Sequence, residues 1–274
     1  MKSLLLNIII ISLFLIIGIF YCRKNFSPIS TDFDELQINN ILTFDSILVG
    51  LYIDNAVWND CKTSTENMLK ELKISYHKIN HDSILTGCLR HYSVLFLPGG
   101  RPDLYCDELG IKGINFIKNY IKMGGGYIGI CGSGFIAAQT NIWRGWAGEP
   151  RIYYKYQGGL GIFKGTADGP IDDFAPTYRD LNCRINILNQ EHPISAGLPE
   201  IVSYIYDHGP EFISDDDTST VIIGKSLNGD HNIILCTKYY NGNIFLSSGH
   251  PEFDVTRTTW QMVSNAITWC SKLN

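Results

Sequence analysis

The chain has 274 residues and a formal net charge of -5, and 45% of its residues are hydrophobic while 18% are charged. The charged fraction lies below the roughly 25% that is typical of soluble proteins, so a well-buried core is expected. The net negative charge and the lack of a basic stripe argue against a nucleic-acid-binding surface. No internal repeat or low-complexity tract is present, and the length fits one α/β domain behind an N-terminal extension.

The N-terminus carries a run of apolar residues at 4–21. At ~1.5 Å per residue, a helix over this run would span about 27 Å, which is close to the thickness of a bilayer core. We therefore predict a signal peptide or signal anchor over residues 1–24, with a lipoprotein signal ending at Cys22 and a buried core helix as alternatives. This prediction implies a membrane-anchored or secreted, extracytoplasmic protein.

The rest of the chain is predicted as a linker at residues 25–45 and one domain at residues 46–274, in which strands and helices alternate. The predicted strands are 46–53, 74–79, 94–97, 127–130, 220–224, 232–239 and 243–246, and the predicted helices are 63–72, 111–122, 133–139 and 258–272. Such alternation predicts a doubly wound, mostly parallel, flavodoxin-like sheet with helices on both faces. Residues 140–185 are predicted as an irregular insertion that walls a pocket, with 161–170 too rich in glycine to be a strand throughout.

Three candidate groups directly follow predicted strands. They are the Gly99-Gly100 pair, Cys131 and His250. In open α/β sheets, ligands bind beyond the carboxyl ends of the strands. We therefore expect the three groups to share one edge of the sheet.

Cys131 lies where a predicted strand turns into a predicted helix, with glycine at 129, 132 and 134. This pattern is typical of a nucleophile elbow. Such a turn strains the backbone at the nucleophile, so its neighbours must lack side chains that would clash. The helix N-terminus that follows favours a thiolate. The sequence predicts Cys131 as a nucleophile, and the alternative is a small buried residue in a tight turn.

A thiol nucleophile needs a base, and the base needs an orienting carboxylate. His250 and Glu252 in Gly-His-Pro-Glu (249–252) supply both residue types after a predicted strand. His192 also precedes a proline, but the residues after it predict a loop entering a turn, so we do not expect it to be catalytic. His208 lines the cleft or, as the favoured alternative, belongs to a structural turn.

The predicted oxyanion and substrate groups lie close to these residues. Gly99 and Gly100 present backbone N–H groups after a strand, and the amide of Gly132 follows the nucleophile. Arg101 is a candidate partner for a substrate carboxylate. The alternatives are an ordinary βα turn and an arginine on the rim without a specific role.

The chain has eight cysteines, whose spacing matches no Cys-x-x-Cys metal pattern. We therefore predict no metal site and no cofactor. Cys236 and Cys270 are expected in the core. In an extracytoplasmic domain, disulfides are possible among four others, which are Cys61, Cys88, Cys106 and Cys183.

Three stretches of the chain resemble the class I glutamine amidotransferase-like superfamily. They are Leu-Pro-Gly-Gly-Arg-Pro-Asp (97–103), Gly-Ile-Cys-Gly-Ser-Gly (129–134) and Gly-His-Pro-Glu (249–252). In enzymes of that superfamily the cysteine attacks a glutamine amide, and a His-x-Glu pair completes the triad. The resemblance implies these roles for the cysteine and the His-x-Glu pair of this chain.

More narrowly, the chain resembles the N-terminal domain of eukaryotic biotin–protein ligases and its stand-alone bacterial relatives, over residues 46–272. The stretches that carry this likeness are 124–132, 165–170 and 192–198. Neither a biotin ligase catalytic domain nor an ammonia-acceptor domain is recognised after them, so biotinylation is not expected. The activity of the narrower family is undefined by the resemblance.

Together these features predict a Cys-His-Glu amidase or hydrolase of glutamine amidotransferase-like type that acts on an unknown small amide. The alternative is a non-catalytic module on the same fold that binds a ligand or partner. The expected partners are a small-molecule amide substrate or an unknown protein, and a membrane through residues 4–21. No nucleic acid is expected.

Overall fold

The structure is a computed structural model of the chain, which divides into the units Met1–Asp45 and Ser46–Asn274. All structural statements below concern the second unit. The described residues are 47–145, 159–172, 181–215, 218–228 and 230–272.

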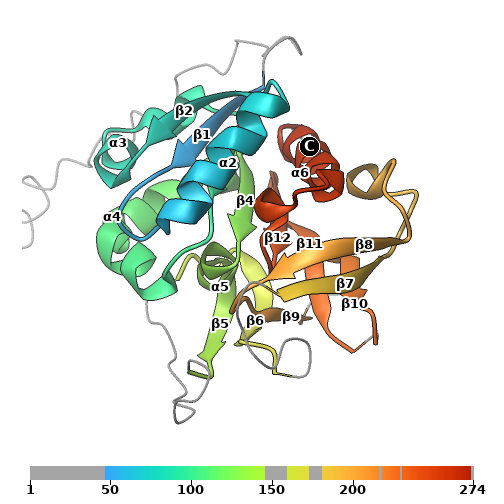
Figure 1. Cartoon of the computed structure of the whole chain (residues 1–274). Helices are drawn as coiled ribbons and strands as arrows, with labels where there is room; N and C mark the ends of the chain where they lie inside the picture. The colour runs from blue at the N-terminus through green and yellow to red at the C-terminus, as the bar shows by residue number, and fades with distance from the viewer. Residues whose placement is uncertain (1–46, 146–158, 173–180, 216–217, 229, 273–274) are drawn as a thin grey trace, which may run out of the picture. The chain divides into compact units, whose positions relative to one another are not determined.

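The centre of the fold is a sheet in which nine of the described strands are ordered β2-β1-β3-β4-β12-β11-β10-β7-β8 (Figure 1). The strands are β1 (Leu48–Tyr52), β2 (Ser75–Ile79), β3 (Val94–Leu97), β4 (Gly126–Ile130), β7 (Leu181–Ile187), β8 (Ile201–Tyr206), β10 (Val221–Ser226), β11 (Asn232–Tyr239) and β12 (Gly242–Ser247). The run from β2 to β12 is parallel. The run from β12 to β8 is antiparallel.

The predicted α/β class is confirmed, and the sheet is mixed because its later strands are joined differently. Strand β11 ends at Tyr239 and β12 begins at Gly242, so two residues connect them. A connection this short forms a hairpin, since a parallel pair needs a crossover of a dozen or more residues. Within this sheet the parallel arrangement is confined to the five strands from β2 to β12, and these strands carry the candidate groups.

Helices cover both faces of the sheet, which places the parallel strands between two apolar layers. The helices are α2 (Asn59–Glu71), α3 (His81–Leu85), α4 (Pro102–Lys122), α5 (Gly132–Ala137) and α6 (Thr258–Cys270). Helices α2 and α6 pack with alternate strand residues such as Val94 and Phe96. Helices α3, α4 and α5 pack with the intervening residues, such as Leu95 and Leu97. Strand β3 is apolar throughout because it is buried on both faces.

A second, three-stranded sheet has the order β5-β6-β9 and consists of β5 (Ala138–Trp143), β6 (Phe163–Gly169) and β9 (Glu211–Ser214). The prediction of an irregular insertion over 140–185 is therefore wrong for its described part. The expectation that 161–170 is not a strand throughout holds only at its ends, because β6 covers 163–169. A Cβ at Gly165 would lie 2.2 Å from the Ile213 carbonyl oxygen. Glycine is present here because the neighbouring strand approaches closely, so it does not argue against a strand.

Some predicted boundaries also differ from the structure. Helix α4 begins at Pro102 rather than at residue 111, and it contains a break at Gly110, where φ is 53° and ψ is -178°. Gly110 therefore joins two helical segments, of which the sequence pattern predicts only the second. Helix α5 ends at Ala137, where the chain passes into β5. The sequence pattern does not predict strands β7, β8 and β9.

The predicted N-terminal membrane segment at residues 4–21, with its alternatives, lies outside the described residues. Among the residues that are described, no helix is both long and apolar enough to cross a bilayer. The structure gives no support to the predicted membrane-attached chain with a signal or transmembrane helix, and that prediction is not carried further.

Candidate active site

Cys131 lies between the end of β4 at Ile130 and the start of α5 at Gly132, with φ of 52° and ψ of -109°. A non-glycine residue in such a conformation costs of order 1–3 kcal/mol and persists only where its surroundings hold it. The backbone N–H of Cys131 donates to the carbonyl of Ser247 at 2.8 Å, and its carbonyl accepts from the amide of Gly134 at 2.9 Å. The neighbouring strand β12 and the first turn of α5 thus fix the strained residue.

The glycines around Cys131 allow two loops to touch. A Cβ at Gly132 would lie 1.9 Å from the carbonyl oxygen of Gly100, so the elbow packs directly on the turn after β3. A Cβ at Gly99 would lie 2.4 Å from Cε1 of His250. The turn after β3 therefore contacts both the cysteine loop and the histidine ring, and any side chain at these glycines would force the loops apart.

His250 and Glu252 form a buried pair after β12. Nδ1 of His250 lies 2.8 Å from Oε1 of Glu252, and both side chains are 0% exposed. The imidazole ring lies between two aromatic rings. Phe253 stacks on it at 4.8 Å between centroids, and Trp58 stacks at 6.3 Å. The carboxylate and the two rings leave the imidazole one orientation.

The environment of His250 favours its protonated form. Burial alone would lower its pKa, but the Glu252 carboxylate, with smaller contributions from Cys61 and Cys131, raises the pKa well above its ordinary value. An opposite charge in a buried site acts strongly because little water screens it. The pair is therefore suited to hold an imidazolium.

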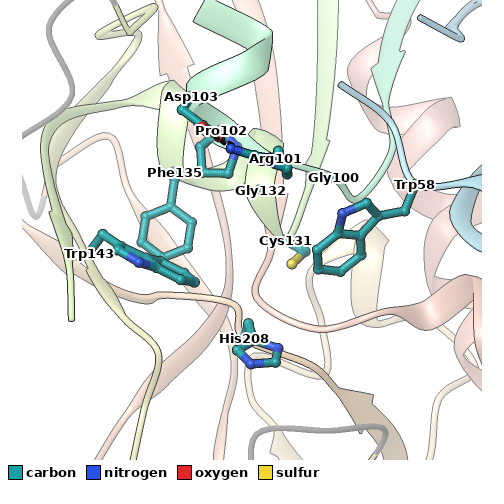
Figure 2. Close-up of a pocket in the computed structure, with 10 residues that line it drawn as sticks. All are labelled: Trp58, Gly100, Arg101, Pro102, Asp103, Cys131, Gly132, Phe135, Trp143 and His208. Atoms are coloured by element: carbon teal, nitrogen blue, oxygen red, sulfur yellow. Dashed lines mark hydrogen bonds and ion pairs between the residues drawn. The ribbon is translucent and has the colours of Figure 1, made fainter. Parts of the chain in front are cut away.

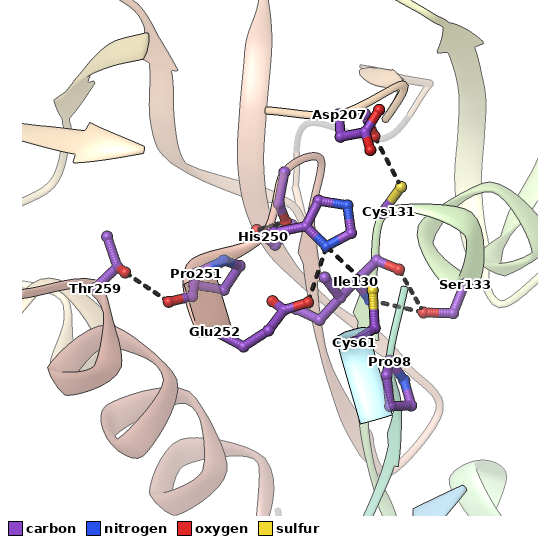
Figure 3. A network of polar contacts seen from close by, with 12 residues as sticks. Cys61, Pro98, Ile130, Cys131, Ser133, Asp207, His250, Pro251, Glu252 and Thr259 are labelled. Atoms are coloured by element: carbon purple, nitrogen blue, oxygen red, sulfur yellow. Dashed lines mark hydrogen bonds and ion pairs between the residues drawn. The ribbon is translucent and has the colours of Figure 1, made fainter. Parts of the chain in front are cut away.

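The thiol of Cys131 and the imidazole of His250 are neighbours without a hydrogen bond between them. The thiol donates to the carbonyl oxygen of Asp207 at 3.2 Å. Nε2 of His250 is buried and makes no hydrogen bond among the described residues. Figure 3 shows Nδ1 of His250 directed to Glu252 and Cys61, while the other ring nitrogen lies on the side of Cys131. We call Cys131, His250 and Glu252 the elbow site.

The structure bears on two of the three amides predicted as oxyanion donors, those of Gly100 and Gly132. The N–H of Arg101 donates to Ala56 at 2.8 Å, and the N–H of Trp58 donates to Gly99 at 3.2 Å. These bonds lie on either side of the antiparallel bridge between Val57 and Gly100. The two bridge residues therefore form a non-hydrogen-bonded pair, in which each backbone N–H points away from the opposing chain. The amide of Gly100 thus faces the elbow rather than Val57. The other predicted donor, Gly132, is the first residue of α5.

A pocket of about 410 Å³ opens above the thiol (Figure 2). Its lining residues are Trp58, Gly100, Arg101, Pro102, Asp103, Cys131, Gly132, Phe135, Trp143 and His208. Arg101, the predicted substrate-carboxylate partner, lies at this pocket with its side chain half exposed and forms an ion pair with Asp103. His208 lines the pocket and contacts the Asp207 carboxylate through Nδ1.

Sequence reasoning missed Cys61 and Trp58. Sγ of Cys61 lies 3.6 Å from Nδ1 of His250, and burial raises the pKa of this thiol to about 12. Both residues follow β1 at the same sheet edge as the predicted groups, which is the one sequence signal that points to them. The seven described cysteines are all free thiols, so none of the disulfides considered from the sequence is formed.

Donor atoms of Cys61, His250 and Glu252 lie within 4.8 Å of one another, a spacing that a metal ion requires. Nδ1 of His250 already contacts Glu252, and it cannot donate its proton there and ligate a metal at the same time. We propose no metal role for these atoms, and the predicted lack of a metal or cofactor stays a prediction.

His192 lies apart from the elbow site, as its sequence context indicated. Its Nδ1 accepts a hydrogen bond from the amide of Ile194, and its Nε2 lies 3.6 Å from Sγ of Cys236. Burial lowers the pKa of His192. The contact with Cys236 belongs to the packing of α6 and β11, since Trp269 of α6 lies against the same ring.

A parallel sheet with a cysteine elbow after one strand and a His-x-Glu pair after its neighbour defines the class I glutamine amidotransferase-like fold. Within this class, residues 49–271 match the family described as biotin-protein ligase, N terminal. The chain belongs to this family, which confirms the resemblance seen in the motifs. The biotin–protein ligase of Schizosaccharomyces pombe is 25% identical over 169 residues, which are 59% of this chain and 26% of that protein. The chain thus spans about a quarter of that relative's length.

Solved structures show the same fold at low sequence identity. A proposed GMP synthase component of Thermoplasma acidophilum is 19% identical with a TM-score of 0.53, covering 82% of this chain and 94% of that one. A proposed ThuA-like protein of Bacteroides uniformis is 13% identical with a TM-score of 0.55, covering 81% and 90%. A protein of Salmonella typhimurium is 12% identical with a TM-score of 0.56, covering 82% and 98%.

The Salmonella protein is described as cytoplasmic, as is a second similar protein from the same organism. These descriptions concern the similar proteins, and neither they nor the described residues, in which no helix could span a membrane, support the predicted membrane-anchored or secreted, extracytoplasmic location. That prediction is withdrawn.

Proposed function

We propose that the chain is a cysteine-dependent amidohydrolase that acts on a small amide. The observation that carries the proposal is the elbow site itself. A cysteine in a strained turn at a helix start lines a pocket, beside a buried histidine that contacts a buried glutamate at 2.8 Å. These are the nucleophile, the base and the orienting group that acyl transfer through a thiol requires.

In the first half of the proposed reaction, the thiol proton has passed to Nε2 of His250, and Sγ of Cys131 attacks the amide carbonyl carbon as the thiolate of a thiolate–imidazolium pair. The negative charge that develops on the carbonyl oxygen is held by the amides of Gly100 and Gly132. The carbon–nitrogen bond then breaks, and His250 returns the proton to the leaving amine. A thioester on Cys131 and free ammonia or amine result.

In the second half, a water attacks the thioester carbon and gives a proton to Nε2 of His250. The carbon–sulfur bond breaks, the carboxylic acid leaves, and the proton returns to the sulfur of Cys131. Glu252 keeps the imidazole oriented and stabilises its charged form in both halves, without itself taking a proton. Before each cycle the thiol leaves its hydrogen bond to the Asp207 carbonyl and turns toward His250.

The test is release of ammonia or amine from a panel of small primary and secondary amides, measured with the full chain and with Cys131→Ala. We expect release by the wild type and a fall to the buffer background in the variant. Cys183→Ala is the matched control, because Cys183 lines a different pocket and its loss should leave the rate unchanged. Equal release by the wild type and Cys131→Ala would contradict the proposal.

A second candidate function, a non-catalytic ligand-binding module, is favoured by one observation. The thiol of Cys131 donates to the carbonyl of Asp207, and Nε2 of His250 makes no hydrogen bond in the described part of the chain. A resting site without a nucleophile–base hydrogen bond fits a fold that binds without turnover. Catalytic hydrogen bonds are also often long or absent before substrate binds, which is why the hydrolase is preferred. Ligand binding without product release from any amide would favour the module.

A further inference from the structure

The pocket above Cys131 is walled by aromatic rings on two sides. Trp58 stands on one side of the thiol, and Phe135 and Trp143 stand on the other (Figure 2). Phe, Tyr and Trp make up 12% of the chain, whereas three of the ten residues that line this pocket are of these types. Aromatic residues are therefore more frequent around this pocket, where a substrate would lie, than in the chain as a whole.

The rings come from elements far apart in the sequence. Trp58 follows β1, Phe135 lies in α5, and Trp143 ends β5 in the second sheet. Phe135 and Trp143 meet edge to face, with 5.7 Å between centroids and 69° between planes, and His208 lies against Trp143 at 6.4 Å. These contacts hold the far wall in one arrangement. A rigid wall of this kind selects the shape of what it contacts.

The ionisable side chains that line the pocket, apart from Cys131, each have a partner among the described residues. Arg101 forms an ion pair with Asp103, and the imidazole of His208 contacts the carboxylate of Asp207. A charged substrate would have to compete with these partners. An uncharged group disturbs none of them, so the pocket favours a neutral ligand with apolar faces.

We propose that the substrate of this site carries an uncharged, flat ring, aromatic or heteroaromatic, next to the amide that Cys131 attacks. The ring lies between Trp58 and the wall formed by Phe135 and Trp143, and the amide lies over the thiol. Stacked and edge-to-face contacts between rings are more favourable than apolar contact of equal area. The inference rests on the proposed function for the amide, whereas the ring preference is a property of the pocket.

The experiment compares three alkylating reagents that share one reactive group and differ only beside it. They are iodoacetamide, its N-phenyl derivative and its N-cyclohexyl derivative. Second-order rate constants at Cys131 are measured by mass spectrometry on the full chain. Cys183 is read in the same digest as an internal reference, because no Phe, Tyr or Trp is among the residues that line its pocket of about 310 Å³. Differences in the intrinsic reactivity of the reagents thereby cancel.

We expect the phenyl reagent to exceed iodoacetamide by about 3- to 10-fold at Cys131, relative to Cys183. The cyclohexyl reagent, which is apolar but not flat, should gain less. Trp143→Phe keeps a flat face and should keep the preference, while Trp143→Leu should lose most of it. Trp269→Leu is the matched control, because Trp269 lies on α6 against His192, and its loss should leave the ratio unchanged.

The outcomes separate this inference from the proposed function. An equal ratio for all three reagents overturns the ring preference, even if amides are hydrolysed. An equal gain for the phenyl and cyclohexyl reagents also overturns it, since the pocket would then select apolar volume. A phenyl preference that Trp143→Leu removes supports the inference, including in a chain that shows no hydrolysis. Trp58 is left unchanged because its ring also contacts His250.

Discussion

The described chain brings a cysteine, a histidine and a glutamate together a second time, away from the elbow site. Cys183 and His231 line the smaller pocket, and Nδ1 of His231 lies 2.7 Å from Oε2 of Glu211. We call these three residues the second cluster. Its residue types and its histidine–carboxylate distance match those of the elbow site, so composition does not distinguish the two regions.

The regions differ in burial. The side chains of His250 and Glu252 are 0% exposed, whereas those of His231 and Glu211 are 20% and 23% exposed. A buried pair interacts through protein of low effective dielectric constant, while a pair in contact with water is screened. The same two groups are therefore coupled far more strongly in the elbow site.

The regions also differ in the backbone that carries the thiol. Cys183 lies inside β7, where it pairs with Tyr204 of β8 in an ordinary antiparallel ladder. Burial raises the pKa of Cys183. Cys131 instead has a positive φ at the junction of a parallel strand and a helix. The comparison teaches that the strained junction and the burial, rather than the residue types, make a candidate site.

Replacing the histidine of each region is the strongest test of whether the elbow site and the second cluster differ. His250→Ala should slow alkylation of Cys131 by iodoacetamide at neutral pH by about 10²- to 10⁴-fold, the usual contribution of a general base. His231→Ala should leave the rate at Cys183 within about twofold, because no elbow places that thiol for proton transfer. Rates at both cysteines are read in the same digest by mass spectrometry.

Both histidine variants are first checked for folding by circular dichroism and urea unfolding. If His250→Ala folds and Cys131 still reacts at the wild-type rate, the histidine is not the base and the elbow site does not differ from the second cluster. Equal slowing of Cys131 and Cys183 in that variant would instead indicate a general loss of structure.

Two glycines sharpen the comparison of the backbones. A Cβ at Gly132 would meet the Gly100 carbonyl oxygen at 1.9 Å, whereas a Cβ at Gly224, in β10 near the second cluster, meets Cδ1 of Ile234 at 3.2 Å. Gly132→Ala should therefore cost about 3 kcal/mol of unfolding free energy or more, because backbone must move. Gly224→Ala should cost less than about 1 kcal/mol, because a side-chain methyl group can shift.

Urea unfolding of the two glycine variants beside the wild type measures both costs. Similar losses for the two variants would mean that the elbow loop relaxes without strain. The close packing of the turn after β3 on α5 would then contribute nothing to the unfolding free energy.

Much of the site edge could be predicted from the sequence, for a local reason. Strands β3, β4 and β12 are short apolar runs that end in Gly99-Gly100, Cys131 and Ser248-Gly249-His250. An apolar run bounded by glycine predicts a buried strand, and parallel strands bring their carboxyl ends to one edge. The positions of these residues directly after the strands were therefore sufficient to predict that they lie at the same edge of the sheet.

The sequence predicted that residues 140–185 wall a pocket, but not which side chains form the wall, because these depend on pairing between distant segments. Trp143 reaches the pocket only because β5 pairs with β6 across residues that the sequence indicated as irregular. Cys61 contacts His250 because α2 packs beside the loop after β12. Periodicity reports which face of an element is buried but not which neighbour covers it, so the aromatic wall and the second thiol appear only in three dimensions.

The two glutamates give the smallest expected effect, and it depends on pH. Glu252→Gln keeps a hydrogen-bonding group beside His250 but removes its charge, so amide hydrolysis should fall by about 10- to 100-fold, as expected for loss of a charge-assisted hydrogen bond worth roughly 1.5–3 kcal/mol. Glu211→Gln should leave hydrolysis unchanged and alter the unfolding free energy by less than about 1 kcal/mol, because its pair with His231 is partly exposed.

The pH dependence of the unfolding free energy tests whether the charge of Glu252 acts on His250 or whether the two side chains are only packed together. Burial lowers the pKa of His250, but chiefly Glu252 raises it well above the ordinary value of 6.5. The stability from this raised pKa is fully present below pH 6.5 and is lost as the pH rises through the value of the folded protein. In Glu252→Gln, burial dominates and the variant should weaken as the pH falls. The stability gap from wild type should therefore be widest at acid pH and narrow toward alkaline pH, and a gap independent of pH would show that the carboxylate charge does not act on His250.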